Sequence, residues 1–203
     1  ATAAETDDCV WTHVVLQGGV GGMAAGIVGC FWDRYGAPRP QFIIVEPEQA
    51  DCLLQSAIEG RPARARGSVD SVMAGLACGE TSPLAWRFLQ PAVDLFMTVA
   101  DAGAEDAMRV LAEGPHGDVT IVGGESGVAG LAGLQALLGD PVGRAAARLD
   151  HRSRVLVINT EGATAPSVYA DIVGRASDEV LRAQQAWLAR SVPSTAGAPG
   201  ASR

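Results

Sequence analysis

The sequence predicts an α/β fold in which a parallel sheet carries helices on both faces, giving three layers. Two observations lead to this class. Short apolar runs that end near glycine alternate with longer segments rich in alanine, leucine and glycine along most of the 203 residues. The first two apolar runs, at residues 9–16 and 41–45, flank a single helical segment. Such a β–α–β unit implies parallel strands, and a parallel sheet is normally covered by helices on both faces.

Length and composition are those of a globular chain. A chain of 203 residues can form one sizeable core, or one half of a larger two-domain enzyme. Hydrophobic residues make up 48% and charged residues 19%, which provides enough apolar surface to offset the entropy lost on folding. No apolar run approaches the ~18 residues of a membrane span, and the first residues are acidic where a secretory signal is basic. We therefore expect a cytoplasmic protein with no membrane segment.

Charge and cysteine spacing exclude two further classes. The net charge of −8 argues against nucleic acid as a partner, because a phosphate-binding surface needs clustered basic residues. The four cysteines, at positions 9, 30, 52 and 78, form no C-x-x-C pair and have no histidine at zinc-finger spacing. No metal site is therefore predicted.

The elements follow one another in the order that this fold requires. The strand at 9–16 leads through a glycine-rich turn to a helix at 23–35, which Gly36, Pro38 and Pro40 end. The strand at 41–45 completes the first unit. Ser82 and Pro83 are typical of the start of a helix, predicted at 83–93. The other predicted helices are 48–59, 102–112, the segment that follows Gly127 as far as 138, and 178–190, and the other predicted strands are 95–99, 119–122 and 154–159.

The predicted organisation has three parts. Residues 1–9 form a lead-in, residues 10–191 form the folded portion, and residues 192–203 form a tail that we expect to be disordered. The tail has the sequence VPSTAGAPGASR and contains too few apolar side chains to pack.

The turn after the first strand is the sharpest local signal. Residues 17–23 read QGGVGGM, and glycines let successive backbone N–H groups turn toward one point. The N-terminus of the following helix adds its partial positive charge, so this turn is a good site for a phosphate. A tight turn that binds nothing is the alternative.

A dinucleotide is a second ligand whose phosphate would fit this turn. The segment from Gly19 to Ala24 also fits G-x-G-x-x-A, and Glu46 follows the next strand, where a dinucleotide-binding fold places its ribose-binding acid. That acid lies somewhat further along than the usual ~20 residues. The glycine turn alone therefore leaves an NAD-dependent oxidoreductase open.

A second glycine-flanked turn, Gly123-Gly-Glu-Ser-Gly127, places a hydroxyl at a predicted strand end. Ser126 can donate a hydrogen bond to a neutral pyridine nitrogen without forcing the ring to be protonated. Its alternative role is to cap the helix that follows, because serine is a preferred N-cap residue.

Five segments carry a resemblance to a known family. In order they are QGGVGGMAAG, IIVEPEQADC, SVMAGLACGE, GGESGVAGL and VLVINTEG. Together they resemble the diaminopropionate ammonia-lyases, which are fold-type II pyridoxal-phosphate (PLP) enzymes of the tryptophan synthase β-like group. The resemblance runs from about Val10 to Val173. The segment 73–80 and the Gly-Glu-Ser-Gly turn are more particular to this family than the glycine loop is.

The resemblance implies a cofactor, a site and a reaction. Main-chain N–H groups of Gly19, Val20, Gly21, Gly22 and Met23 would hold the PLP phosphate. Ser126 would face the pyridine nitrogen, with Thr160 and Gly162 closing the pocket near the ring. The reaction would be an α,β-elimination on 2,3-diaminopropionate, giving pyruvate and ammonia, in a homodimer. Related dehydratases that act on threonine or serine are near alternatives.

The basic residues set a limit on this chemistry. All fifteen are arginine, and the sequence contains no lysine. A PLP enzyme holds its cofactor as a Schiff base on a lysine amine, which arginine cannot replace. The resemblance places that lysine and the catalytic acids in an N-terminal half of the enzyme, so this chain is predicted to contain no catalytic residue of its own. A catalytically inactive fragment is therefore a further alternative.

The resemblance also bears on three other residues. Cys52 and Cys78 lie in segments that the family shares, so a disulfide between them is possible, although a reduced pair is the expectation in a reducing cytosol. Glu125 is expected to order its turn or to hold a substrate amine, since a carboxylate is favoured beside a cation.

Overall fold

The structure is a computed structural model that describes residues 9–191. The predicted tail and nearly all of the predicted lead-in lie outside the described residues. Four parallel strands form one sheet in the order β3-β2-β1-β4. The strands are β1 (His13–Gln17), β2 (Gln41–Pro47), β3 (Leu95–Val99) and β4 (Val155–Val157).

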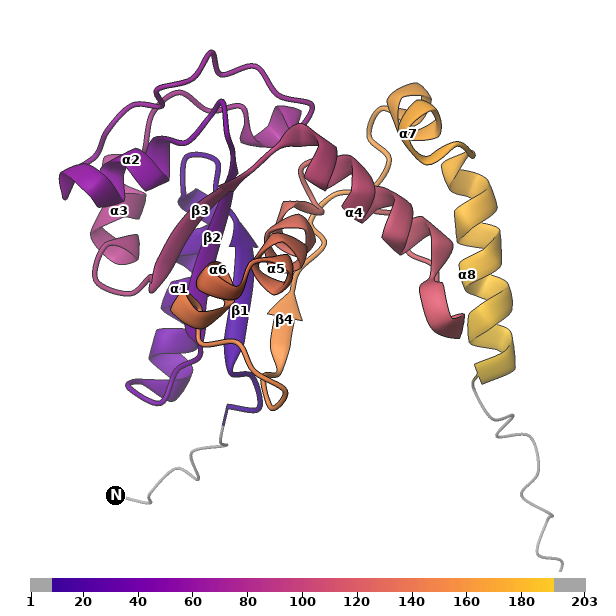
Figure 1. Ribbon diagram of the computed structural model, residues 1–203, viewed down its shortest axis with the longest axis horizontal. Coiled ribbons are helices and arrows are strands. Elements are labelled where there is room, and N and C mark those ends of the chain that lie inside the picture. The colour runs from indigo at the N-terminus through magenta and orange to yellow at the C-terminus, as the bar shows by residue number, and fades with distance from the viewer. Residues whose placement is uncertain (1–8, 192–203) are drawn as a thin grey trace, which may run out of the picture.

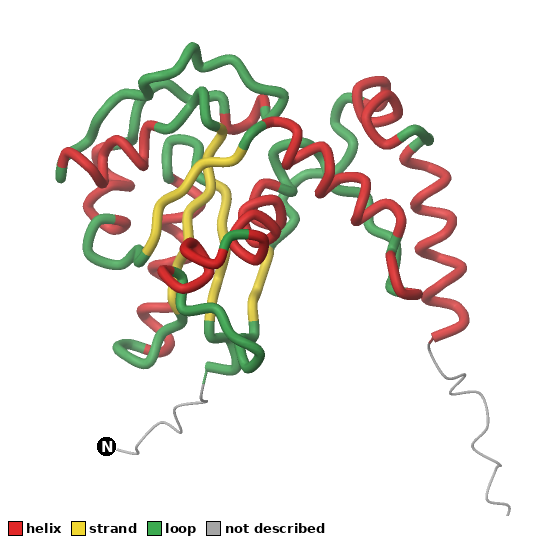
Figure 2. The backbone as a smooth tube through the Cα atoms, viewed as in Figure 1, coloured by secondary structure: helices red, strands yellow, loops and turns green. Residues whose placement is uncertain are grey.

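Helices cover both faces of this sheet, which confirms the predicted three-layer α/β class (Figure 2). Alternate residues of β1 and β2 pack into two separate cores, with Val14 in one and Val15 in the other. The core that contains Val14 is closed by α1 (Gly22–Tyr35), α2 (Cys52–Glu59) and α3 (Pro83–Leu89). The core that contains Val15 is closed mainly by α4 (Asp101–Glu113) and α5 (Ala129–Gly139).

The C-terminal helices extend the second layer. Figure 1 shows α4, α7 and α8 grouped to one side of the sheet, where Tyr169 and Val180 bury their side chains in the same core as α4. The remaining helices are α6 (Pro141–Ala146), α7 (Pro166–Val173) and α8 (Ser177–Ser191), with short 3-10 turns η1 (Ala74–Leu76) and η2 (Pro115–Gly117). None of the helices within residues 9–191 is long and apolar enough to cross a bilayer.

Several predicted elements have the observed boundaries to within a residue or two, and one prediction was wrong. The segment 119–122, expected to be a strand, is not part of the sheet. Its backbone bonds elsewhere, because Ile121 N donates to Leu111 O at the end of α4 and Asn159 Nδ2 donates to Val122 O. The helix expected to begin at residue 48 begins at Cys52, after a turn in which Ala50 N donates to Pro47 O.

Other differences concern element ends and short helices. The first strand begins at His13 rather than at residue 9, the strand expected at 154–159 is limited to β4, and α3 ends at Leu89. Neither α6 nor α7 was predicted from the sequence. Both begin with proline in their first turn, and Asp140 caps α6 by accepting from Val142 N and Gly143 N.

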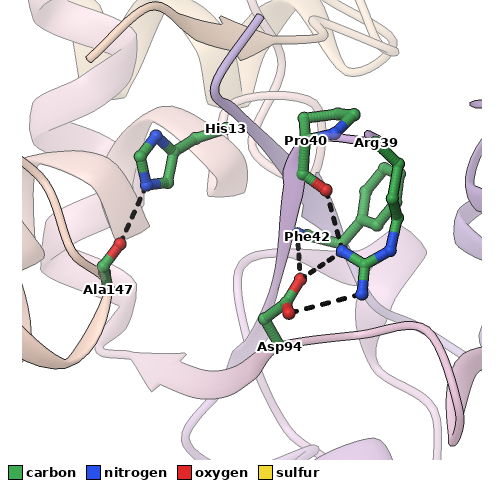
Figure 3. Close-up of polar contacts among 6 residues, drawn as sticks. All are labelled: His13, Arg39, Pro40, Phe42, Asp94 and Ala147. Carbon is green, nitrogen blue, oxygen red and sulfur yellow. Dashed lines mark hydrogen bonds and ion pairs between the residues drawn. The ribbon is translucent and has the colours of Figure 1, made fainter. Parts of the chain in front are cut away.

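At the amino end of the sheet, polar side chains form hydrogen bonds and an ion pair with one another and with the backbone (Figure 3). Asp94 accepts the Phe42 N–H at 2.8 Å and pairs with Arg39, whose Nη1 lies 2.6 Å from its Oδ2. On the other side of the sheet, His13 Nε2 lies 2.8 Å from Ala147 O. Each of these contacts joins a strand to a neighbouring loop, so the amino end is closed by the protein itself.

Candidate functional site

The carboxyl ends of β1 and β4 open into a cavity of about 600 Å³. Four segments form its wall: the glycine loop after β1, residues 75–78, the turn at 123–127 and the loop after β4. Ligands bind at this edge in open α/β sheets because loops from several strands converge there. The cavity lining includes these residues expected from the sequence: Gly19, Val20, Gly22, Met23, Ser126, Thr160 and Gly162.

The glycine loop reaches its shape through two left-handed residues. Gly19 has a φ of 60° and Gly21 a φ of 96°. A Cβ at Gly21 would also lie 2.9 Å from Leu89 Cδ1, so this position excludes every larger residue. Gly21 does not line the cavity, and its N–H bonds to Gly18 O at 3.2 Å. Its part in the loop is therefore conformational, which differs from the donor role expected for it.

Some backbone groups of the loop already have a protein partner, and others are free to bind an anion. The Val20 carbonyl accepts from Ser82 N, and the Val20 N–H faces the Cys78 thiol. Within the described residues, the N–H groups of Gly19, Gly22 and Met23 have no assigned acceptor. The last two belong to the first turn of α1, where helical N–H groups lack an internal partner and the helix dipole is positive. These N–H groups fit a phosphate.

Glu46 lies behind the loop and does not reach the cavity. Its side chain is fully buried, and its carboxylate accepts from Leu53 N at 2.9 Å and Leu54 N at 2.8 Å. Burial raises its pKa to about 7, against the opposing effect of those backbone hydrogen bonds. A Cβ at Gly18 would lie 2.5 Å from Glu46 Cγ, so glycine is required there. Because Glu46 is committed to the start of α2, it is not available as a ribose-binding acid, and the dinucleotide alternative loses its second element.

Cys52 and Cys78 lie on either side of Gly19. Cys52 Sγ donates to Gly19 O at 3.4 Å, and a Cβ at Gly19 would lie 3.7 Å from Cys78 Sγ. Both are free thiols in the structure. Burial raises the pKa of Cys52 to about 12 and also raises that of Cys78. The reduced pair was the expectation from the sequence, and the disulfide that the resemblance allows is not formed in the structure.

Ser126 belongs to the cavity wall and not to a helix cap. The helix α5 begins three residues later, with Val128 as its N-cap residue. Ser126 Oγ accepts the Gly75 N–H at 2.9 Å, which joins its turn to the segment around η1. A Cβ at Gly75 would lie 2.9 Å from the same oxygen, so only glycine allows this approach.

Two residues of the site have roles that the sequence analysis did not assign. Glu161 orders the turn, because its Oε2 accepts from Ser126 N at 2.8 Å and from Gly127 N at 3.2 Å. Gln17 lies at the end of β1 and lines the cavity, and its amide bonds to the loop after β4. The available signal for Gln17 was a polar side chain at the end of an otherwise apolar strand. Glu125, expected to order the turn or to bind a substrate amine, is buried and does not line the cavity.

The arrangement defines a class of protein. An α/β sheet places unpaired N–H groups at one part of the cavity and the hydroxyls of Ser126, Thr160 and Thr164 elsewhere on its wall. Such a cavity suits a ligand with a phosphate and a ring that accepts hydrogen bonds. Among residues 9–191 no group of three or more potential metal ligands occurs.

The chain belongs to the pyridoxal-phosphate-dependent enzyme family, whose sequence profile matches residues 2–161. It is 38% identical over 176 residues to the diaminopropionate ammonia-lyase of Salmonella typhimurium, covering 84% of this chain and 44% of that protein. It is 40% identical over 165 residues to the enzyme of the same name from Escherichia coli strain K12, covering 80% and 42%. The chain thus spans less than half the length of these relatives.

Solved structures agree with this assignment. The holo diaminopropionate ammonia-lyase from Escherichia coli superimposes with a TM-score of 0.73 at 39% identity, covering 80% of this chain and 41% of that chain. Maize serine racemase superimposes with a TM-score of 0.65 at 21% identity, covering 81% and 48%, and this likeness concerns the fold alone.

The residues of the cavity fit part of the family's cofactor. A glycine cradle with unpaired N–H groups fits its phosphate, and hydroxyl groups on the wall fit its ring. The aldehyde of PLP needs a lysine amine, and none of the 203 residues is lysine. The cavity thus has groups that fit the phosphate and the ring, but no lysine amine.

Proposed function

We propose that this chain is the part of a PLP-dependent diaminopropionate ammonia-lyase that binds the phosphate and one side of the ring. The observation that carries the proposal is the convergence of the glycine loop, Ser126 and Thr160 on one cavity, although both hydroxyl residues lie more than a hundred positions after the loop in sequence. The relatives at 38–40% identity, which bear that enzyme name, support it.

The chain's residues have distinct tasks in this proposal. Gly19, Gly22 and Met23 bind the phosphate through their N–H groups, and the dipole of α1 favours its negative charge. Ser126 donates a hydrogen bond to the ring nitrogen, and Thr160 and Gly162 close the pocket beside the ring. When bound, PLP withdraws electrons from Cα of the amino acid, which allows the α-proton and then the β-amine to leave. Glu125 lies outside the cavity lining and has no assigned task in this scheme.

The amine and the acid–base groups must come from another polypeptide segment. We propose that this segment is an N-terminal half of the same enzyme. The longer relatives, of which this chain spans only part, have room for such a half. A homodimer in the cytoplasm acting on a small amino acid completes the proposal.

Product stoichiometry tests the substrate. The protein that carries this sequence together with a lysine-bearing half would be supplied with PLP and with 2,3-diaminopropionate, serine or threonine in turn. Elimination from diaminopropionate followed by hydrolysis gives one pyruvate and two ammonia molecules, whereas serine gives one of each. We expect the first stoichiometry and the highest kcat/KM with diaminopropionate.

The alternatives have their own outcomes. A higher kcat/KM with threonine or serine would identify a dehydratase, and no turnover of any substrate would identify a catalytically inactive protein. Tight binding of NAD by this chain would reinstate the dinucleotide alternative.

A further inference from the structure

Gln17 makes an unusual set of contacts at the bottom of the cavity wall. Its side chain is buried, with 1% of its surface exposed, and it is the last residue of β1. The amide nitrogen Nε2 lies 2.9 Å from Gly127 O, 2.9 Å from Ile158 O and 2.7 Å from Thr160 Oγ1. One side chain thus joins β1 to the turn at 123–127 and to the loop after β4.

The chemistry of the neighbours fixes how this amide is turned. The carbonyl oxygens of Gly127 and Ile158 can only accept hydrogen bonds. If the amide were reversed, Oε1 would face both carbonyl oxygens without a proton between them. The –NH₂ group must therefore point at these three oxygens and share its two N–H groups among them. Oε1 has no hydrogen-bond partner within the described residues.

This orientation determines what Thr160 can do. The amide nitrogen donates and does not accept, so Thr160 Oγ1 can only be the acceptor in their 2.7 Å contact. The hydroxyl proton of Thr160 must then be given to another group. In the described part of the chain no acceptor is assigned to it, and Thr160 lines the cavity. Its proton is left for a ligand.

Ser126 shows the same arrangement on another part of the wall. Its Oγ accepts the Gly75 N–H, so its proton is also left for the cavity. A donor behind each hydroxyl makes that hydroxyl a donor in turn. The cavity wall is therefore suited to a ring that presents acceptor atoms.

We propose that Gln17 is a positioning residue that makes Thr160 a hydrogen-bond donor to the ring of the bound cofactor. The identity of that ring rests on the proposed function. Gln17 touches no reacting atom in this scheme, because it acts through the hydroxyl of Thr160.

The test uses a probe that needs no lysine. 4-Deoxypyridoxine 5′-phosphate has the ring and phosphate of PLP but lacks the aldehyde, so its affinity for this chain reports the phosphate and ring contacts alone. Calorimetric titration with this probe, and separately with inorganic phosphate, would be made on the chain and on Gln17→Met, Thr160→Val and the double variant. Gln55→Met is the matched control, because Gln55 is also buried with an unpartnered Oε1 but does not line the cavity.

We expect Gln17→Met and Thr160→Val each to weaken binding of the probe about tenfold, the effect of one lost hydrogen bond. Because both variants remove the same contact, the double variant should bind about as weakly as either single variant. Affinity for inorganic phosphate should stay within about twofold, and Gln55→Met should change neither affinity. Thr160→Ser, which keeps the hydroxyl, should bind the probe about as the parent chain does.

Four results would overturn the proposal. Effects that multiply in the double variant would mean that Gln17 does not act through Thr160. An equal loss of phosphate and probe affinity in Gln17→Met would mean that Gln17 only holds the loop. If Gln17→Met does not fold, the variants at the exposed Thr160 provide the test. Equal affinity of Thr160→Val and Thr160→Ser for the probe would refute the donor role of the hydroxyl. If the parent chain binds no probe at all, the proposed function fails together with this inference, whereas the other results leave that function standing.

Discussion

The two ends of the sheet differ in how their polar groups are used. At the amino end, Asp94 is shared between Arg39 and the Phe42 N–H, and His13 bonds to Ala147 O, so each polar group has a protein partner (Figure 3). At the carboxyl end, N–H groups of the glycine loop and the protons of two hydroxyls remain without one in the described residues. Polar content alone does not distinguish the ends. The ends differ in how many of their hydrogen-bonding groups lack a protein partner.

The difference follows from the cost of unpaired groups. A buried donor or acceptor without a partner costs about 1–3 kcal/mol, so a stable fold keeps few of them. The carboxyl end keeps its donors at the edge of an open cavity, where a ligand can pair with them. The same end also holds the buried carboxylate of Glu46, and among residues 9–191 the amino end has no buried carboxylate to match it.

The largest expected effect is at Gly21 of the glycine loop. A left-handed conformation costs a residue with a Cβ about 1–2 kcal/mol, and crowding against Leu89 adds about 1–3 kcal/mol. We expect Gly21→Ala to lower the free energy of unfolding by about 3 kcal/mol in urea titrations and to abolish measurable phosphate binding. Gly60→Ala is the control, because Gly60 is also left-handed but has open space around it. It should cost about 1 kcal/mol and leave phosphate binding intact. Equal effects of the two substitutions would remove the distinction between the ends.

Glu46 should make stability depend on pH. Its pKa is raised by burial to about 7 in the folded chain, from an ordinary value of 4.5. The folded state therefore favours the protonated form, so this contribution is fully present below pH about 4.5 and is lost as the pH rises through about 7. The stability of the parent chain relative to Glu46→Gln should fall by about 3 kcal/mol between pH 4.5 and 8, measured by urea unfolding. Glu48→Gln, at an exposed position nearby, is the control. A constant difference would show that the hydrogen bonds from α2 keep Glu46 charged.

The backbone pattern at the carboxyl end of the sheet could be predicted from the sequence, whereas the side-chain hydrogen bonds at that end could not. Alternating apolar strands and glycine turns were enough for the fold class, the glycine loop and Ser126, because these depend on local pattern. The hydrogen bonds of Glu161 and Gln17 were not predicted, because their partners lie 34 to 143 residues away and only the folded chain brings them together. The segment 119–122 was misassigned for a related reason. It is apolar like a strand, but its hydrogen bonds go to α4 and Asn159.

At the amino end, Asp94→Ala should affect stability without affecting the site. It removes the acceptor of the Phe42 N–H and the partner of Arg39. We expect a loss of about 2 kcal/mol in the free energy of unfolding, with unchanged affinity for inorganic phosphate. Asp94→Asn keeps an acceptor and loses only the charge pair, so it should cost about 1 kcal/mol or less. A change in phosphate affinity in either variant would mean that the two ends are coupled through the sheet.

The smallest perturbation is chemical labelling of the parent chain. With its pKa at about 12, only about one Cys52 thiol in ten thousand is ionised at pH 8, and its side chain is buried. Cys30 is exposed on α1, so iodoacetamide should modify it first and Cys52 last, as followed by peptide mass mapping. Cys78 lines the cavity, and 4-deoxypyridoxine 5′-phosphate should slow its labelling while leaving Cys30 unaffected. Equal protection of both would mean that the probe acts on the whole fold. A mass for only two free thiols under non-reducing conditions, with Cys52 and Cys78 unlabelled, would instead establish the disulfide between them.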